Sequence, residues 1–300
     1  MGKITDLLES GKILVSDGAW GTFLHTLGLK PGECPELWSV SHEDEVSGIA
    51  ERYIRAGADM VETNSFGGSR FKLRHFGLAD RAPEINEAAA RASRRAVGDT
   101  GRFVIASMGP TGEMLVTEDV TEDELYEAFR EQAEAFERGG ADAVCIETMS
   151  DLREAVCAIK AVKENTSLEV IATFTFDRTK QGTDRTMMGL SPEDAARGAV
   201  EAGADITGTN CGNGMERMCG IVKEMKAACP DSFILVHANA GLPAERDGQT
   251  IFPETPDVMA RHVRTLIESG ANIVGGCCGT TPEHISAIKR EKDAYTASRA

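Results

Sequence analysis

Three cysteines are the residues of this chain best suited to chemistry. Cys277 and Cys278 are adjacent in GGCCGTTPEHI, and the distant Cys211 lies in TNCGNG. Zinc prefers tetrahedral coordination and binds thiolates well. Three protein sulfurs would leave its fourth position open for a substrate, and an open position distinguishes a catalytic zinc site from a structural one.

The adjacent cysteines have two other interpretations, a strained vicinal disulfide and simple core packing. Consecutive strand residues point to opposite faces, so packing would bury only one of the two sulfurs. The surrounding glycines, Gly275, Gly276 and Gly279, allow backbone angles that could turn both sulfurs to one side. The spacing favours metal binding and leaves the two alternatives open.

The remaining cysteines are interpreted as unliganded. Cys145 lies in the apolar run ADAVCIET, and Cys157 lies among apolar residues of an expected helix, so we expect both in the core. Cys34, Cys219 and Cys229 are also expected to bind no metal. The six histidines show no paired ligand spacing and are given no metal role: His25, His42, His75, His237, His262 and His284.

Composition limits the classes of protein to consider. The chain has 300 residues, 41% of them hydrophobic, and no linker-like stretch, so we expect one domain over residues 1–300. A net charge of −16 disfavours nucleic acid and anionic membranes as partners. The start lacks the apolar core of a signal peptide, and no apolar run approaches the ~20 residues of a membrane helix. We therefore expect a cytoplasmic protein whose thiols are free or metallated.

A repeated pattern indicates the architecture. Four segments begin with Gly-Ala-Asp or Gly-Ala-Asn and continue as a short apolar strand: 57–64, 140–148, 203–210 and 270–276. Four more apolar segments lie between them: 12–18, 103–109, 169–176 and 233–241. The stretches between strands have helical periodicity and start signals, such as Thr121 with Glu124 and Ser191 before Pro192. Eight alternating units predict an α/β fold of the closed (β/α)8 TIM barrel type.

In such a barrel, functional groups gather where the strands end. The expected strand ends carry polar or turn residues: Asp17, Glu62 with Asn64, Gly109-Pro110-Thr111, Glu147 with Thr148, Asp177, Asn210 with Cys211, Asn239, and Cys277 with Cys278. Cys211 ends the sixth strand and the pair ends the eighth, so the three sulfurs could face a common metal across the mouth. The helix expected after Thr281-Pro282 would favour ionised thiols nearby.

Seven motifs follow one another along nearly the whole chain: DGAWGT at 17–22, GADMVETNSF at 57–66, GPTG at 109–112, IETMSDLREA at 146–155, TNCGNG at 209–214, NAGLP at 239–243 and GGCCGTTPEHI at 275–285. They resemble the homocysteine S-methyltransferase family, particularly the homocysteine-binding domain of cobalamin-dependent methionine synthase. The resemblance implies a zinc-containing barrel that activates homocysteine as a thiolate and methylates it to methionine. It also implies that Cys211, Cys277 and Cys278 are the zinc ligands.

The resemblance further suggests substrate contacts. Asp17 and Glu147 would recognise the amino group of homocysteine, and amides around Gly18 would hold its carboxylate. Asn210 and Asn239 would contact substrate or orient a cysteine sulfur. Each has a structural alternative, because a carboxylate after a strand can cap a helix or accept loop amides, and asparagine often forms turns.

The chemistry of such a site follows from its ligands. A neutral thiol is a weak nucleophile, whereas zinc coordination removes its proton and holds the sulfur toward a methyl donor. Three thiolates around a divalent ion leave an anionic centre, which keeps the added sulfur electron-rich. Transfer would be an in-line displacement that needs positioning and no protein nucleophile.

Two departures from the expected motifs concern the substrates. Trp20 stands where a methionine is usual in DGAMGT, and Ala238 stands where PNAGLP has proline. The large indole could reshape the pocket, so homocysteine or another small thiol is the expected acceptor. The sequence shows no folate, cobalamin or activation module, so methylcobalamin or another corrinoid is expected in trans, free or on a separate corrinoid protein. S-methylmethionine, S-adenosylmethionine or a betaine are alternative donors.

Two functions of other classes stay open beside methyl transfer. A metal-independent barrel lyase would use Glu147 and neighbouring carboxylates as acid and base; it predicts activity after zinc removal and tolerance of Cys277→Ser. A noncatalytic zinc- or thiol-binding protein would serve a methyl carrier, and it predicts bound metal without turnover.

Overall fold

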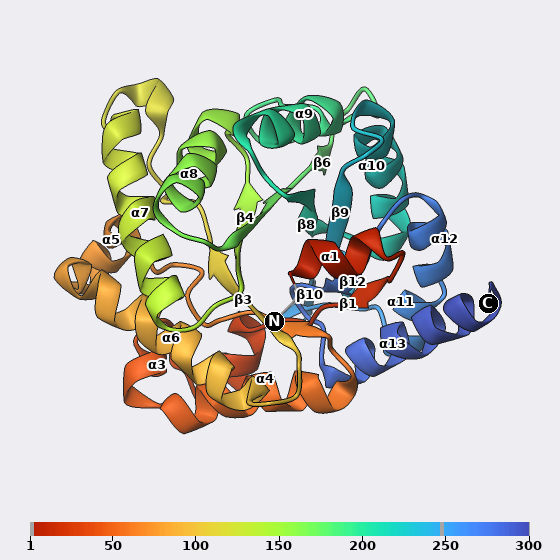
Figure 1. Cartoon of the computed structure of the whole chain (residues 1–300), viewed down its shortest axis with the longest axis horizontal. Coiled ribbons are helices and arrows are strands. Elements are labelled where there is room, and N and C mark those ends of the chain that lie inside the picture. The colour runs from red at the N-terminus through yellow and green to blue at the C-terminus, as the bar shows by residue number, and fades with distance from the viewer. Residues whose placement is uncertain (1–2, 247–248, 300) are drawn as a thin grey trace.

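A computed structural model of the chain describes residues 3–246 and 249–299 (Figure 1). Within them, eight strands form one parallel sheet in the order β1-β12-β9-β8-β5-β4-β3-β2. Their bounds are β1 (Leu14–Val15), β2 (Met60–Val61), β3 (Phe103–Met108), β4 (Ala143–Met149), β5 (Glu169–Phe174), β8 (Ile206–Gly214), β9 (Phe233–Asn239) and β12 (Ile273–Gly276). Each lies inside or overlaps a predicted strand segment, so all eight strand predictions are confirmed.

The two edge strands of this sheet meet and close the ring. The backbone N–H of Asp59, just before β2, donates to the carbonyl of Val15 in β1 at 2.7 Å. The Asp59 carboxylate accepts the N–H of Val15 at 2.8 Å. The fold is therefore the predicted (β/α)8 TIM barrel.

The Gly-Ala-Asp/Asn repeat has a physical explanation in the structure. Its glycines have positive φ angles where a helix gives way to the next strand: Gly57 (104°), Gly140 (89°), Gly203 (104°) and Gly270 (119°). Glycine adopts this left-handed conformation without the steric cost that a Cβ imposes. The repeat thus ends a helix and starts a strand.

The acidic or amide residue of each repeat ties its strand to the preceding one. In all four repeats its side chain accepts a backbone N–H of the strand before it: Asp59 from Val15, Asp142 from Val104, Asp205 from Val170 and Asn272 from Ile234. These bonds fix pairs of strands at the end of the barrel opposite the cysteines.

Helices surround the strands (Figure 1). Their bounds are α1 (Ile4–Glu9), α2 (Gly21–Leu27), α3 (Trp38–Ser41), α4 (Glu43–Ala56), α5 (Arg70–Leu73), α6 (Ala82–Val97), α7 (Glu122–Arg138), α8 (Leu152–Asn165), α9 (Pro192–Ala202), α10 (Met215–Ala228), α11 (Pro256–Ala260), α12 (Val263–Glu268) and α13 (Pro282–Ala297). The predicted starts are confirmed where Thr121 caps α7 with Glu124 and Ser191 caps α9. No helix in the described part of the chain is long and apolar enough to cross a membrane.

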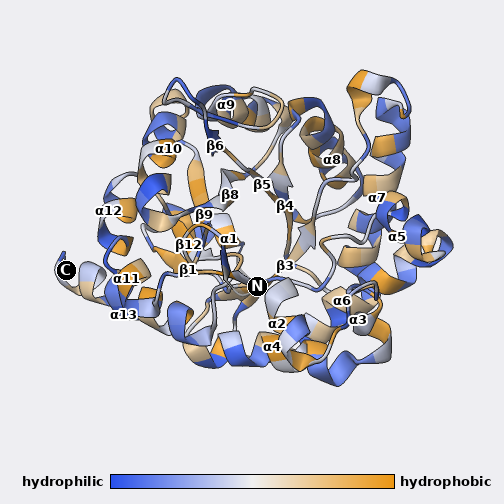
Figure 2. Cartoon of the chain, turned by 180° about the vertical axis from the view of Figure 1, so that it is seen from behind, coloured by the Kyte–Doolittle hydropathy of each residue, from blue (hydrophilic) through white to orange (hydrophobic). Residues whose placement is uncertain are grey.

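The helices are amphipathic, and α4 illustrates the pattern. Val46, Ile49, Ala50 and Tyr53 are buried at helical spacing, and Figure 2 shows hydrophilic and hydrophobic residues mixed along the same helix. The apolar stripe packs on the barrel while the polar stripe faces water. At the bottom of the barrel, Glu169 of β5 accepts the N–H of Ile4 at 2.6 Å, which holds α1 there.

Two short antiparallel hairpins were not predicted. They follow β5 and β9, in loops on the side where the main strands end: β6 (Asp177–Arg178) with β7 (Asp184–Arg185), and β10 (Ala244–Arg246) with β11 (Gln249–Ile251). Strands of two or three residues carry too little apolar alternation to be visible in a sequence. Asp177, expected at a barrel strand end, lies in the first hairpin and is exposed.

Two glycine substitutions should separate barrel packing from helix propensity. A Cβ on Gly208 of β8 would lie 2.0 Å from the backbone oxygen of Leu235, whereas a Cβ on Gly220 of α10 would meet nothing within 4 Å. We expect Gly208→Ala to destabilise the protein by roughly 3 kcal/mol, because backbone must move, and Gly220→Ala to stabilise it by about 1 kcal/mol. Thermal unfolding of both variants checks this. Equal melting temperatures would show that β8 and β9 can separate without cost.

Candidate functional site

The three predicted ligand cysteines come together at the mouth. The Sγ atoms of Cys211, Cys277 and Cys278 all lie within 4.8 Å of one another, and those of Cys211 and Cys278 are 3.9 Å apart. Two sulfurs bound to one tetrahedral zinc at about 2.3 Å would be separated by about 3.8 Å. The donor set and its spacing therefore fit a zinc ion.

Irregular backbone aims one of these sulfurs. The pairing of β8 with β9 shifts between Asn210 and Gly214, and Cys211 has a φ of 57°. A left-handed conformation is uncommon for a residue with a Cβ, and bulges of this kind reorient side chains next to functional sites. A second non-glycine residue in this conformation, Thr148 (φ 62°), follows Glu147. The Thr148 N–H donates to Asn210 Oδ1 at 2.8 Å, so the residue just before Cys211 holds the turn at Thr148.

The cysteine pair is fixed by backbone bonds to β9 and the turn after it. Cys277 N donates to the carbonyl of Ala238 at 2.7 Å, and the Cys278 carbonyl accepts from the N–H of Ala240 at 3.0 Å. Gly279 then turns with a φ of +78°, and a Cβ there would lie 2.2 Å from the Phe252 ring. Of the glycines expected to allow unusual backbone angles beside the cysteine pair, Gly279 has such an angle.

The thiols influence one another's ionisation. Hydrogen bonds from Cys277 and Cys278 hold the pKa of Cys211 well below its usual range, although burial opposes this, and Gly212 and the Asn239 side chain assist. Hydrogen bonding to Cys211 raises the pKa of Cys277 and of Cys278. The protein groups alone therefore favour a thiolate at Cys211, and a cation bound between the sulfurs would favour ionisation of the other two thiols.

A cavity of about 380 Å³ opens beside the cysteines, which form part of its wall. The turn at residues 18–22 and the strand-end carboxylates Glu62 and Glu147 also line it. Its volume is typical of a site for a small molecule. Three residues that the sequence assigned to substrate lie outside its lining: Asp17, Asn210 and Asn239.

Asp17 lies behind the wall and is fully buried. Its Oδ2 accepts the indole N–H of Trp20 and the backbone N–H of Glu62, both at 2.8 Å. Burial, together with the neighbouring Glu62 charge, raises the pKa of Asp17 to about 7. Trp20 lines the cavity and Asp17 does not, and the indole N–H occupies one of the two Asp17 oxygens.

Glu147 is held by partners from two other strands. Its carboxylate accepts a hydrogen bond from the Ser107 hydroxyl of β3 and another from Asn210 Nδ2 of β8, the latter at 3.2 Å. Burial and the charge of Glu62 raise the pKa of Glu147. Asn210 thus orients Glu147, while the Asn239 side chain helps to lower the pKa of Cys211.

His237 was not among the site residues predicted from the sequence. This residue of β9 is buried, and its Nδ1 lies 3.5 Å from Glu62 Oε1. Glu62, Glu147 and His237 bring potential ligand atoms within 4.8 Å of one another. Spacing along the chain could not reveal this cluster, because its members come from three separate strand ends; the inward position of His237 two residues before Asn239 was the available signal.

The buried Glu62 carboxyl should make stability depend on pH. Burial raises its pKa from 4.5 to about 8, so the folded chain keeps a proton that the unfolded chain has released. Stability then falls as pH rises between these values. Glu62→Gln removes this effect. Its free energy of unfolding relative to that of wild type should therefore rise by on the order of 3 kcal/mol from pH 5 to pH 8. Denaturant unfolding at both pH values measures the change, and a constant difference between the proteins would contradict it.

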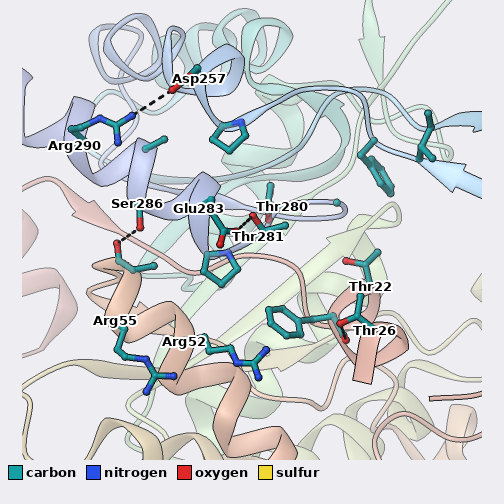
Figure 3. A pocket seen from close by; sticks show the side chains of 18 of the residues that line it. Thr22, Thr26, Arg52, Arg55, Asp257, Thr280, Thr281, Glu283, Ser286 and Arg290 are labelled. Carbon is teal, nitrogen blue, oxygen red and sulfur yellow. Dashed lines mark hydrogen bonds and ion pairs between the residues drawn. The ribbon is translucent and has the colours of Figure 1, made fainter. Parts of the chain in front are cut away.

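A larger cavity, of about 1080 Å³, lies against the outer helices (Figure 3). Arg52 and Arg55 of α4 extend along one side, and Arg290 of α13 faces Asp257 at 3.5 Å on the other. The guanidinium of Arg52 lies over the Phe23 ring. Its described lining contains no cysteine, so the smaller cavity is the candidate active site.

Comparison with known proteins agrees with this geometry. The homocysteine S-methyltransferase family matches residues 14–291. Methionine synthases from Mycobacterium leprae and Mycobacterium tuberculosis are each 34% identical over 95% of this chain, which spans about a quarter of their length (25%).

Solved structures show the same fold. The metallated form of the homocysteine methyltransferase MmuM from Escherichia coli superposes with a TM-score of 0.77 at 21% identity, covering 95% of this chain and 98% of that one. A methyltransferase from Methanosarcina mazei gives a TM-score of 0.63 at 12% identity, covering 95% and 94%. With the family match over nearly its whole length, the chain belongs to the homocysteine S-methyltransferase family.

Proposed function

We propose that this protein is a zinc-dependent thiol S-methyltransferase that converts homocysteine to methionine, with residues 1–300 acting as one homocysteine-binding barrel domain. One observation carries the proposal: three cysteine sulfurs converge on the wall of a cavity that also holds buried carboxylates. The family match over residues 14–291 supports the same reaction.

Cys211, Cys277 and Cys278 would hold the zinc. When bound there, zinc supplies the acidity that ionises a substrate thiol and keeps its sulfur facing the methyl donor. The chain contributes geometry: the turn at Cys211 and the backbone bonds of the pair fix the three sulfurs before substrate arrives. Such preorganisation lowers the entropic cost of bringing sulfur and methyl group into line.

The amino acid portion of homocysteine would lie in the cavity. Glu147 faces it and would accept the ammonium group, while Asp17 adds negative charge from behind Trp20. Backbone amides at Gly18 would receive the substrate carboxylate. Asn210 orients Glu147, and Asn239 orients Cys211.

The methyl donor is proposed to be methylcobalamin or a methylcorrinoid protein, supplied in trans. The similarity to methionine synthases supports this choice. S-methylmethionine, S-adenosylmethionine and a betaine are the alternatives within the same chemistry. All eight cysteines are free thiols, which suits a reaction in the reducing cytoplasm.

A donor panel tests the proposal. Zinc-loaded protein would receive homocysteine with methylcobalamin, S-methylmethionine, S-adenosylmethionine or glycine betaine, before and after chelation, and methionine would be quantified. We expect methionine from one donor, chelator-sensitive and restored by zinc. Bound zinc without methionine from any donor would favour the noncatalytic zinc- or thiol-binding alternative.

A further inference from the structure

We propose that Glu62, positioned by His237, is a second carboxylate that binds the ammonium group of the substrate and selects α-amino thiols over thiols without an amino group. This inference rests on the proposed function and names a specificity determinant of the same cavity.

Glu62 is placed to meet a ligand. It lines the cavity, and its side chain is otherwise buried, with 8% of the residue exposed. Among the described residues, its Oε1 has no hydrogen-bond partner and neither does His237 Nε2. That oxygen lies on the His237 side of the carboxyl group. Burying a carboxyl group without a donor is costly, so a donor that reached the part of Glu62 lining the cavity would be stabilising.

The charges around the cavity specify the kind of group. Glu62 and Glu147 face the same space, and none of the described residues lining it is lysine, arginine or histidine. In the free protein, burial raises the pKa of Glu62 to about 8 and keeps its carboxyl protonated near neutral pH; a cationic group on the ligand would favour the ionised form. A primary ammonium has three N–H donors, so it can satisfy both carboxylates at once, and charge-assisted hydrogen bonds are the strong ones.

Asp17, the carboxylate that the motif suggested for this task, is differently engaged. Its Oδ2 already accepts from Trp20 and from the Glu62 backbone, and the residue does not line the cavity. Glu62 comes from the neighbouring strand end and points where Asp17 does not. Because the Trp20 indole occupies an oxygen of Asp17, we assign direct contact with the ammonium group to Glu62 in place of Asp17.

His237 is the positioning residue. It is 1% exposed, and its Nδ1 lies 3.5 Å from Glu62 Oε1. Burial lowers its pKa, so it is a neutral ring that can orient the carboxylate without neutralising it. It does not line the cavity, so it would act on a bound ammonium through the carboxylates that do.

Paired substrates test the assignment. Homocysteine and 4-mercaptobutanoate differ only in the amino group, and both would be offered to zinc-loaded protein with the donor that supports turnover. We expect Glu62→Gln to lower kcat/KM for homocysteine by about 10- to 100-fold, mainly through KM, and to change kcat/KM for 4-mercaptobutanoate less than about twofold. His237→Gln should give the same pattern with a smaller loss.

Glu36→Gln is the matched control. Glu36 also lines the cavity, but its carboxylate already accepts from the Gly67 N–H at 2.8 Å and from the Cys34 thiol. Any change in kcat/KM that Glu36→Gln causes should be equal for homocysteine and 4-mercaptobutanoate.

Three outcomes would overturn the inference while leaving the proposed function intact. They are an unchanged kcat/KM for homocysteine in Glu62→Gln, a loss that is equal for the two thiols, and a second zinc per wild-type chain that Glu62→Gln removes, which would identify the cluster as a metal site. Wild-type protein that methylates neither thiol with any donor would instead contradict the proposed function itself.

Discussion

Replacing Cys278 by serine is expected to lower methionine formation by about 1000-fold. The serine hydroxyl is far less acidic than a thiol and is a poor zinc ligand, so the variant should also retain less than one zinc per chain. The partner sulfur of Cys211, 3.9 Å away, would remain in place. Zinc quantification and initial rates at saturating homocysteine measure both effects.

Cys229→Ser is the control for this variant. Cys229 is a free, partly exposed thiol at the end of α10, and it does not belong to the three-sulfur cluster. It should keep wild-type zinc content and rate. Full activity in Cys278→Ser would exclude three-cysteine ligation and favour a metal-independent reaction.

Glu147→Gln should produce the second large loss, about 100-fold in kcat/KM for homocysteine. The substitution removes a negative charge from the cavity wall and disturbs the hydrogen bonds from Ser107 and Asn210. An amide can also offer its NH₂ group to the ammonium, which adds repulsion. Steady-state kinetics across homocysteine concentrations would show the effect mainly in KM.

Glu154→Gln gives a comparison at a buried carboxyl of the same length. Glu154 of α8 accepts the N–H and hydroxyl of Thr111 and does not line the cavity. Its variant should lose some stability and keep its KM. A Glu147→Gln variant with unchanged KM would place the ammonium elsewhere.

The barrel could be predicted because the glycine and the polar residue of its Gly-Ala-Asp/Asn repeat each have a local structural role. The glycine of Gly-Ala-Asp/Asn ends a helix, and the next polar residue bonds the preceding strand, so the same short motif marks four strand starts. The hairpins after β5 and β9 left no comparable signal because each strand has two or three residues.

The sequence predicted those parts of the site whose chemistry follows from residue type alone. Cysteines at two strand ends predicted a set of metal ligands, and the structure brings those sulfurs together. The orientation of Asp17 could not be predicted, since it depends on an indole that folds back from position 20. His237 was missed because its partners, Glu62 and Glu147, are distant in the chain and meet only once the barrel closes.

The central claim is that a substrate thiol completes a three-cysteine zinc site, and X-ray absorption at the zinc K-edge tests it most directly. Zinc-loaded protein would be measured with and without homocysteine, using methionine as the control ligand. We expect three protein sulfurs around zinc in the free protein and four sulfurs after homocysteine is added, with no fourth sulfur from methionine. A sulfur number that stays at three with saturating homocysteine would contradict the account.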